Sequence, residues 1–529
     1  MPEGRVLNTP SGKTLLRILR EGGVHIESPC GGAGTCGKCG VMVLSGEAPP
    51  PSLNERAFNL GDRRRLACRL VPAENITVEL CGPAFLNVLS EEEVVSSEES
   101  STSMKKEISS SLGLAADIGT TTLEAALVDL NTGRELASRS ALNPQARFGM
   151  DVLSRISHVM ARPESLQEMR GMLTKTLDAM AEALCREVGA RPSAIEQVAA
   201  AGNCAMLHIL MGVNPAPLGA FPFTPAFTEA LDVPAAEAGL KGLARLYCPP
   251  SASAFIGADI VAGVCASGLT RREGNTLFID IGTNGEMVLS RGGKLASCSC
   301  AAGPALEGMN ISHGSHAAPG AVEDVFIGAD GLVRLKIVGR QGVGYPPFDT
   351  APPLLGLCGS GVLAAVREFL RVGLLRTDGA FTGRGGLPGE VLAALYAEDG
   401  LSIRLGGGIA VTQKDVRQVQ LAKGALLSGA HALLAYTGLE VRDLDAVLVA
   451  GQFGAHLSAG LLTDCGVIPP GLEKKVEYLG NTSKAGARLA LNSSAARREM
   501  EELAREIAYL DLSALANYEP LFLRCLNFD

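Results

Sequence analysis

Long hydrophobic runs are missing from this chain. Every apolar stretch is interrupted by glycine, serine or a charged residue before the roughly 18 residues that a membrane-spanning helix needs. The N-terminal stretch MPEGRVLNTPSGK also lacks the charged-then-apolar order of a secretory signal peptide. Long basic blocks are absent too, and a formal net charge of -9 at pH 7 disfavours nucleic acid and anionic membranes as the main partner. These absences predict a soluble cytoplasmic protein.

Tryptophan is absent, and so are two familiar nucleotide-binding signatures. The chain has neither a complete Walker A loop nor a Rossmann fingerprint, which disfavours a P-loop enzyme and an NAD oxidoreductase. A large core does not require tryptophan, because 47% of the 529 residues are hydrophobic. A chain of this length exceeds what one hydrophobic core usually supports, so we expect about two to four domains.

Cysteine, in contrast, is plentiful. In a cytoplasmic chain, 14 cysteines argue against disulfides and for thiolate chemistry or simple burial. Cys30, Cys36 and Cys39 lie on the glycine-rich loop SPCGGAGTCGKCG, and Cys68 follows in RRRLACRL. Three thiolates on one loop can surround a metal cluster from one side while a fourth closes it, and the glycines let backbone amides point at sulfur. Cys81 has no evident place in this set and is expected to be a small buried hydrophobe.

Two kinds of metal centre suit four thiolates. Four cysteines can hold tetrahedral zinc, but zinc knuckles usually consist of two C-x2-C pairs and this set contains one. The five-residue gap between Cys30 and Cys36 resembles that of the adrenodoxin-like 2Fe-2S ferredoxins. This resemblance implies a 2Fe-2S cluster that is bound by Cys30, Cys36, Cys39 and Cys68 in a β-grasp domain.

The residues around these cysteines predict a small α+β domain over residues 1–84. A helix closed by Gly22 and Gly23 precedes the cysteine loop, and GVMVLSG and NITVEL are typical of strands. Residues 85–112 are rich in serine and glutamate and poor in residues that can pack, which predicts a flexible linker. From residue 113 to 529, apolar strands alternate with helices and glycine-rich turns, the pattern of an α/β fold.

Two segments of the α/β region repeat one design. AADIGTTTLEAALVDL, residues 115–130, and FIDIGTNGEMVLS, residues 278–290, each contain a strand, an Asp, a Gly-Thr turn and a second strand. Asp117 and Asp280 can hold Mg²⁺ or its waters, while glycine amides and threonine hydroxyls approach phosphate oxygens. A third segment, VLVAGQFGAHL, ends a strand in glycines against which an adenosine can lie. One such motif can be an ordinary strand end, but all three in this order predict two similar halves around one nucleotide.

These motifs resemble the phosphate-1, phosphate-2 and adenosine motifs of the ASKHA superfamily, the fold of actin, Hsp70 and sugar kinases. The resemblance implies a two-lobed ATPase domain over residues 113–529, with lobes of roughly 113–270 and 271–529. It assigns the catalytic carboxylates to Asp117 and Asp280. The other residues that it places around ATP and Mg²⁺ are Gly119, Thr120, Thr121, Gly282, Thr283, Asn284, Gly451 and Gly454.

A ferredoxin-like domain on a linker, followed by an ASKHA ATPase domain, is similar to the reductive activators of corrinoid-dependent enzymes. Further stretches fit that family, namely AAGPALEGMNISHG, LCGSG and YLGNTSKAGA. In the family, the corrinoid protein of a methyltransferase system is occasionally oxidised to inactive Co(II), and the activator returns one electron to restore Co(I). The resemblance therefore implies an ATP-dependent reductase with two partners, a corrinoid protein and an external low-potential electron donor. It also suggests a homodimer, which no residue pattern requires.

Several residues outside these motifs have two interpretations. A hydroxyl of Ser297 or Ser299 in LASCSCAAGPALEG can approach cobalt as a weak axial ligand, or these residues alternate on a half-buried strand. His313 and His316 lack a third ligand, which favours a surface loop, and His208 on an apolar helical face is expected to be a satisfied core histidine. The three arginines of GDRRRLAC form either a docking patch for an acidic donor or a solvated turn.

Two other functions are compatible with the same motifs. In one, the protein is a redox-sensing regulator whose cluster state governs ATPase-linked binding to a partner, without net electron delivery. In the other, it is a small-molecule kinase fused to a ferredoxin, although no motif identifies a catalytic base or a substrate cleft.

Overall fold

The computed structural model of the chain describes most of the predicted ATPase region and part of the cysteine-rich region. The described residues are 6–7, 12–21, 24–26, 39–46, 48–52, 55, 63–72, 75–80, 85–86, 111–328, 330, 332–339, 354–383, 395–397, 400–451 and 457–528. Cys30, Cys36, Gly454 and nearly all of the predicted linker lie outside them, so the predictions for those residues stay predictions. None of the helices in the described part of the chain combines the length and hydrophobicity that a bilayer crossing requires.

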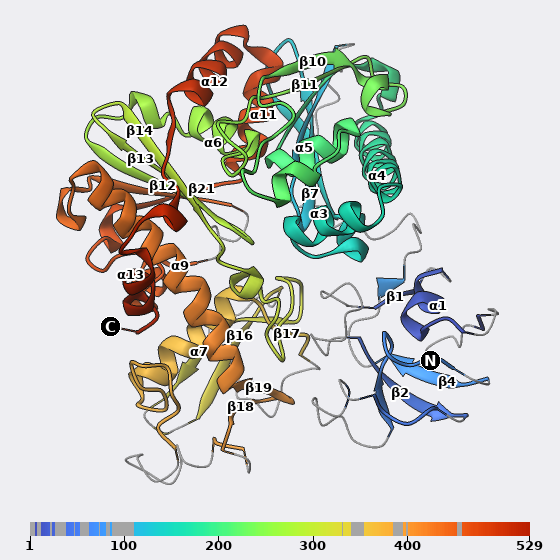
Figure 1. Ribbon diagram of the computed structural model, residues 1–529, viewed down its shortest axis with the longest axis vertical. Helices are drawn as coiled ribbons and strands as arrows, with labels where there is room; N and C mark the ends of the chain where they lie inside the picture. Colours follow the sequence, from blue (N-terminus) through green and yellow to red (C-terminus); the bar gives the residue numbers. More distant parts are fainter. Residues whose placement is uncertain are drawn as a thin grey trace.

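The N-terminal region folds as an α+β unit, drawn in blue in Figure 1. Its sheet has the strand order β3, β2, β4, with β2 antiparallel to both neighbours, and leucines of α1 share a core with Val41, Val43 and Leu66. β1 pairs with β5, so this pairing includes residues 85–86, which the composition had assigned to the linker. The elements are α1 (Leu15–Glu21), β1 (Val24–His25), β2 (Gly40–Ser45), β3 (Arg64–Leu66), β4 (Thr77–Leu80) and β5 (Phe85–Leu86).

The first large sheet has six strands in the order β10, β11, β9, β6, β7, β8. β6, β7 and β8 form an antiparallel meander, while β9 and β11 extend the sheet on the other side of β6 as parallel strands. β6 is apolar and buried along nearly its whole length, as a central strand covered on both faces must be. The elements of this half are β6 (Leu112–Ile118), β7 (Thr122–Asp129), β8 (Glu135–Leu142), α3 (Val152–Ala161), α4 (Ser165–Val188), β9 (Ile195–Gly202), α5 (Cys204–Met211), β10 (Leu231–Pro234) and β11 (Arg245–Cys248).

The second large sheet repeats this topology. Its order is β21, β20, β12, β13, β14, β22, in which β12, β13 and β14 form the antiparallel meander and β20 and β21 are the parallel strands. The predicted pair of similar halves is therefore confirmed, with β6 and β12 in equivalent central positions. The strands are β12 (Asn275–Ile281), β13 (Gly285–Arg291), β14 (Lys294–Cys300), β20 (Ala446–Ala450), β21 (Val476–Gly480) and β22 (Ala508–Tyr509).

Two helices, α6 (Ala258–Ser267) and α11 (Thr482–Asn492), pack against each other between the two sheets (Figure 1). Glycine permits this close approach. A Cβ on Gly486 would lie 2.3 Å from the carbonyl oxygen of Ala262, and a Cβ on Gly263 would lie 2.7 Å from Thr482 Oγ1. α11 lies between β21 and β22 of the second sheet in the sequence but contacts β6 and β9 of the first, so it joins the two halves.

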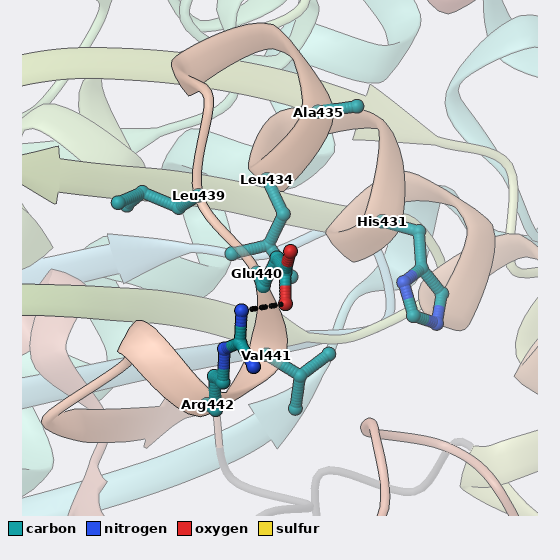
Figure 2. A pocket seen from close by; sticks show the side chains of 7 residues that line it. All are labelled: His431, Leu434, Ala435, Leu439, Glu440, Val441 and Arg442. Atoms are coloured by element: carbon teal, nitrogen blue, oxygen red, sulfur yellow. Dashed lines mark ion pairs between the residues drawn. The ribbon is translucent and has the colours of Figure 1, made fainter.

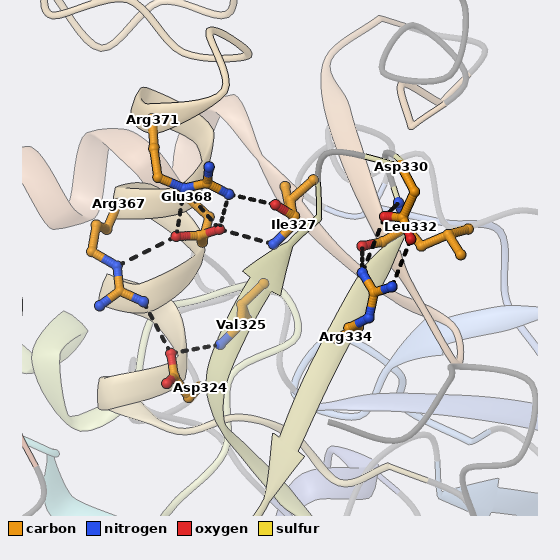
Figure 3. A network of polar contacts seen from close by, with 9 residues as sticks. All are labelled: Asp324, Val325, Ile327, Asp330, Leu332, Arg334, Arg367, Glu368 and Arg371. Atoms are coloured by element: carbon orange, nitrogen blue, oxygen red, sulfur yellow. Dashed lines mark hydrogen bonds and ion pairs between the residues drawn. The ribbon is translucent and has the colours of Figure 1, made fainter. Parts of the chain in front are cut away.

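A further layer beside the second sheet contains the small sheet β16, β15, β17 and two long helices. α7 is held to β15 by Glu368, whose carboxylate accepts a 2.8 Å hydrogen bond from the Ile327 amide and pairs with Arg371 at 2.6 Å (Figure 3). Glu368 is 2% exposed, so these donors replace its water. The elements are β15 (Ala321–Ile327), β16 (Val333–Ile337), β17 (Gly356–Leu357), α7 (Gly359–Arg371), β18 (Ser402–Gly406), β19 (Ile409–Thr412), α9 (Gln413–Thr437), α10 (Ala459–Asp464) and α13 (Tyr518–Cys525), while α12 (Ser494–Glu506) packs against α6 and α11.

We predict that Glu368→Ala lowers the free energy of unfolding by about 1–3 kcal/mol, because it leaves the Ile327 amide buried without an acceptor. The matched control is Asp330→Ala, which removes the neighbouring ion pair with Arg334 in Figure 3. That pair is exposed and screened by water, so its loss should destabilise the protein much less than Glu368→Ala does. Urea unfolding of both variants measures the difference, and equal effects would contradict the structural role of Glu368.

Candidate functional site

Asp117 and Asp280 occupy the same position in the two halves, one residue before the ends of β6 and β12. Both residues are half-buried. Burial raises the pKa of Asp117 to about 6, against hydrogen bonds from Asn481 and Ser483 that lower it. The pKa of Asp280 is raised to about 7 by burial and then by the charges of Asp117 and Glu307. The fold thus brings the two predicted aspartates close enough to repel each other.

Three more carboxylates join this pair. Burial and the charges of Asp280 and Asp117 raise the pKa of Asp259, in the first turn of α6, to about 8. Burial and the neighbouring aspartates also raise the pKa of Glu286 on β13. The pKa of Glu307 is raised by burial, which outweighs the opposing effects of Thr283, His316 and Thr121. We call Asp117, Asp259, Asp280, Glu286 and Glu307 the acidic cluster.

The acidic cluster fits a hydrated cation better than a directly ligated one. Within the described residues, no three acidic, imidazole or thiol groups converge closely enough to hold a metal ion by themselves. Mg²⁺ in nucleotide sites usually keeps several waters and takes one or two carboxylates together with phosphate oxygens. Bound Mg²⁺ would relieve the mutual repulsion of these half-buried carboxylates. The residues therefore fit Mg²⁺ that arrives with a nucleotide.

The loop after β6 is held from several sides. Asn143 Nδ2 donates to the carbonyl oxygen of Gly119 at 2.8 Å, and Asn203 Nδ2 donates to Thr120 Oγ1 at 3.0 Å. The buried Arg155 donates to the carbonyl oxygen of Thr120. A Cβ on Gly119 would lie 2.4 Å from the carbonyl oxygen of Thr122, so only glycine fits this turn. The loop is therefore fixed in place before any ligand binds, which favours phosphate binding.

The loop after β12 lies against the other two motifs. Thr283 Oγ1 donates to Glu307 Oε1 at 2.9 Å, and the Gly282 amide donates to the carbonyl oxygen of Asn284 at 3.0 Å. Gly451, at the end of β20, has φ +95°, and a Cβ there would lie 3.0 Å from Asp280 Oδ1. The structure thus brings Gly451 of the predicted adenosine motif next to Asp280 of the second phosphate motif.

Residues at the start of α11 complete the site. Ser483 Oγ donates to one oxygen of Asp117 at 2.8 Å, and Asn481 Nδ2 donates to the other at 2.8 Å. Asn481 Nδ2 also reaches Glu124 at 2.8 Å, and Glu124 pairs with Lys484. Sequence reasoning noted this stretch only as a family resemblance and missed its contact with Asp117. It also missed three acidic cluster members, Asp259, Glu286 and Glu307.

Ser299 lies opposite Glu286 in the pairing of β13 with β14, and its hydroxyl is 3.4 Å from Glu286 Oε1. Its approach to cobalt stays a prediction. The alternative prediction, that Ser297 approaches cobalt, is wrong. Ser297 is fully buried, and its hydroxyl donates to the carbonyl oxygen of Ala508. The expected core role of His208 is confirmed: its Nδ1 lies 2.7 Å from the carbonyl oxygen of Cys204, and Nε2 accepts from the Ala226 amide at 3.0 Å.

The two described cysteines of the predicted cluster lie on adjacent chain segments. The antiparallel pairing of β2 with β3 places the Ala67 amide 2.7 Å from the carbonyl oxygen of Cys39, and Cys68 is the next residue. Both cysteines are buried and neither is in a disulfide. Strand pairing thus brings Cys68 next to Cys39, as a shared cluster requires.

One of the three arginines near the cluster cannot belong to a docking patch. Arg65 is 3% exposed, and its guanidinium donates to both carboxylate oxygens of Glu55, at 3.0 and 3.2 Å. Glu55 Oε1 also accepts from the Leu66 amide at 3.0 Å. Arg63 and Arg64 are exposed. The pair therefore anchors β3, and Arg65 is structural.

A separate hollow of about 500 Å³ lies at the C-terminal end of α9 (Figure 2). Its lining is largely apolar, and its two charged residues, Glu440 and Arg442, pair with each other at 2.9 Å in an exposed position. None of the predicted site residues lines it. It therefore has no part in the site described above.

Three domain models match successive parts of the chain. A 2Fe-2S iron-sulfur cluster binding domain matches residues 1–73, the RACo middle region matches residues 112–272, and the C-terminal domain of RACo, the ASKHA domain, matches residues 274–529. These matches confirm the predicted fold class, a 2Fe-2S ferredoxin-like domain followed by an ASKHA domain. They also support a 2Fe-2S cluster over zinc at the cysteine loop.

Relatives match over most of the chain. Corrinoid activation enzyme RamQ of Eubacterium limosum is 32% identical over 396 residues, which cover 72% of this chain and 64% of RamQ. The Co(II) methylated amine-specific corrinoid protein reductase of Methanosarcina barkeri is 27% identical, over 75% of this chain and 72% of that protein. The solved structure of a reductive activator for corrinoid, iron-sulfur protein is 29% identical and superimposes with a TM-score of 0.70, over 100% of this chain and 97% of that one.

We predict that the nucleotide-free protein loses stability as the pH rises from about 4 to 7. The folded pKa values of Asp117 and Asp280, about 6 and 7, lie above the ordinary value of 3.8, so in this range the folded state binds more protons than the unfolded state. Mg²⁺ with a non-hydrolysable ATP analogue should therefore raise the melting temperature more at pH 8 than at pH 6. Asp280→Asn should weaken this pH dependence, and an equal ligand effect at both pH values would contradict it.

We predict that Glu55→Ala destabilises the N-terminal domain by about 3 kcal/mol or more at pH 7, because it leaves Arg65 buried without its carboxylate. Burial alone raises the pKa of Glu55, but hydrogen bonds from Arg65, Ser52 and Leu66 lower it to about 2. The stability from Glu55 is thus present above its ordinary pKa of 4.5 and is lost as the pH falls toward 2. Thermal bleaching of the cluster absorbance at pH 7 and pH 4 measures both effects. The exposed Glu79→Ala is the control and should change neither.

Proposed function

Because this chain belongs to the RACo family, the family of reductive activators for corrinoid proteins, we propose that it reduces a corrinoid protein in an ATP-dependent reaction. One electron passes from a 2Fe-2S cluster to inactive Co(II) and restores the Co(I) that accepts methyl groups. The supporting observation is that one chain combines a cysteine-rich ferredoxin-like domain with two phosphate loops around paired aspartates. An external low-potential donor would refill the cluster.

The need for ATP follows from redox energetics. For one electron, each ~59 mV of unfavourable potential difference lowers the equilibrium constant tenfold. Transfer to Co(II) from a 2Fe-2S donor is uphill, so reduced cobalt would stay rare without coupling. A nucleotide that binds one conformation of the two halves more tightly can shift the population toward the complex in which transfer succeeds. Hydrolysis then returns the activator to its starting conformation.

Residues of the N-terminal domain hold and shield the electron donor. A bound 2Fe-2S cluster would supply a one-electron carrier. Cys39 and Cys68, together with Cys30 and Cys36 on the loop, would supply its thiolates. The core around Cys39 and Cys68 excludes water, and the Glu55–Arg65 pair fixes the strand that leads to Cys68.

Residues of the ASKHA domain hold the nucleotide and connect it to the rest of the fold. Asp117 and Asp280 would bind waters of Mg²⁺, while the hydroxyls of Thr120 and Thr121 and the backbone amide of Thr283 would donate to phosphate oxygens. Gly451 leaves room beside Asp280 for the nucleoside side of the ligand. Any shift of Asp117 on binding must move Asn481 and Ser483, and with them α11, because both oxygens of Asp117 are bonded to them.

Visible spectra of a Co(II) corrinoid protein test the proposed function. With the activator, a strong reductant and MgATP, the Co(I) spectrum should form, and it should be lost without ATP. Cys39→Ser should abolish Co(I) formation and leave MgATP binding unchanged, whereas Asp280→Asn should weaken MgATP binding and leave the cluster spectrum unchanged.

Two results would contradict this function. Isolated protein without iron and acid-labile sulfide would exclude the electron donor. Unchanged Co(II), despite a reduced cluster and demonstrated binding of the corrinoid protein, would instead favour the redox-sensing regulator. Exposed Glu440→Gln, outside both sites, is the control and should behave as the wild type.

A further inference from the structure

Glu307 is the member of the acidic cluster that lies beside both phosphate loops. Its carboxylate accepts a 2.9 Å hydrogen bond from Thr283 of the second loop, and the side chain of Thr121 from the first loop lies close enough to lower its pKa. A Cβ on Gly282 would lie 4.0 Å from Glu307 Oε1, so the carboxylate lies beside the second loop.

The backbone that carries Glu307 is fixed. Glu307 ends the short 3-10 helix Pro304–Glu307, and the next residue, Gly308, has φ +78°. A Cβ on Gly308 would lie 2.3 Å from the carbonyl oxygen of Ser315, so this turn requires glycine. The carboxylate is therefore held in one place relative to the two loops, which is the arrangement expected of a group that positions a reactant.

Three other carboxylates of the acidic cluster are engaged elsewhere. Both oxygens of Asp117 accept hydrogen bonds from α11. Asp259 accepts from the Ile260 amide of its own helix at 2.9 Å. Glu286 interacts with Asn284 and Ser299, which both lie in the second half. Asp280 is the expected partner of Mg²⁺ waters.

We propose that Glu307 orients the water that attacks the terminal phosphate of ATP, an inference that rests on the proposed ATPase function. Thr283, whose hydroxyl donates to Glu307, belongs to the loop whose backbone amides are expected to contact phosphate oxygens, so the carboxylate lies at the edge of the phosphate site. Two anions repel at direct contact, but a water molecule between them can donate a hydrogen bond to the carboxylate and turn its lone pair toward phosphorus.

The step balances as a hydrolysis. The water oxygen forms a bond to the terminal phosphorus, and the bond from that phosphorus to the bridging oxygen breaks. The bridging oxygen leaves with the electron pair as part of ADP. The proton that the water loses passes to the Glu307 carboxylate and from there to solvent.

The test separates nucleotide binding from hydrolysis. Glu307→Gln should bind MgATP with wild-type affinity and keep the wild-type melting temperature, because the amide still accepts from Thr283. Its single-turnover rate of phosphate release should fall roughly 10²-fold or more, the usual contribution of a positioned proton acceptor. In Glu307→Ala, added formate should restore part of this rate by entering the space that the side chain leaves.

Glu440→Gln, at the exposed end of α9, is the matched control and should hydrolyse ATP at the wild-type rate. Wild-type hydrolysis by Glu307→Gln would overturn the inference. Loss of MgATP affinity in parallel with hydrolysis, or a formate response equal to that of the wild type, would also overturn it by assigning Glu307 a structural role. A wild-type protein that neither binds nor hydrolyses MgATP would refute the proposed function itself. The Glu307 variants test only the role of Glu307.

Discussion

The carboxylate of Asp117 is held by two side chains, Asn481 and Ser483, that lie 364 and 366 residues further along the chain. This contact depends on the close crossing of α6 and α11, which requires Gly263 and Gly486. The first phosphate loop and the crossing helix therefore cannot move independently. Because α11 also joins the two sheets, the position of one carboxylate is tied to the relative arrangement of the two halves.

The fold brings five half-buried carboxylates close enough to raise one another's pKa values, and the donors that bond to Asp117 are the neutral side chains of Asn481 and Ser483. Burial and mutual repulsion raise their pKa values, which is unfavourable for the nucleotide-free protein near neutral pH. Structures retain such groups where they have a function, because a bound cation or a proton in transit stabilises them there. We therefore expect a bound cation to relieve the repulsion within the acidic cluster.

Buried polar groups elsewhere in the chain show the opposite behaviour. Glu368 accepts from a backbone amide and from Arg371, and Glu55 is saturated by Arg65, Ser52 and Leu66. His208 has a partner at each ring nitrogen. These groups stabilise the fold, and their hydrogen-bonding positions are already occupied by protein partners. A guanidinium partner thus distinguishes Glu55 and Glu368 from Asp117, whose two donors are neutral.

Local patterns were enough to predict a 2Fe-2S ferredoxin-like domain followed by an ASKHA domain, whereas the cysteine ligand set stays a prediction. They also predicted the two Asp-x-Gly-Thr turns, because a strand places Asp117 or Asp280 near its end and the following glycine shapes the turn. The repeated design also predicted the two halves, since similar segments form similar meanders.

Other features were decided by tertiary structure. The burial of Arg65 depends on Glu55, which lies on a separate segment, and the approach of Cys68 to Cys39 depends on the pairing of β2 with β3. Asp259, Glu286 and Glu307 lack a local signature, because a helix start, a strand and a short turn bring them together only when both halves have packed. Sequence determined which chemical groups this protein has at its strand ends. Only the packing of the two halves decided which of these groups lie close enough to shift one another's pKa values. Charges interact according to their distance in space, and residues far apart in the sequence can be close in the fold.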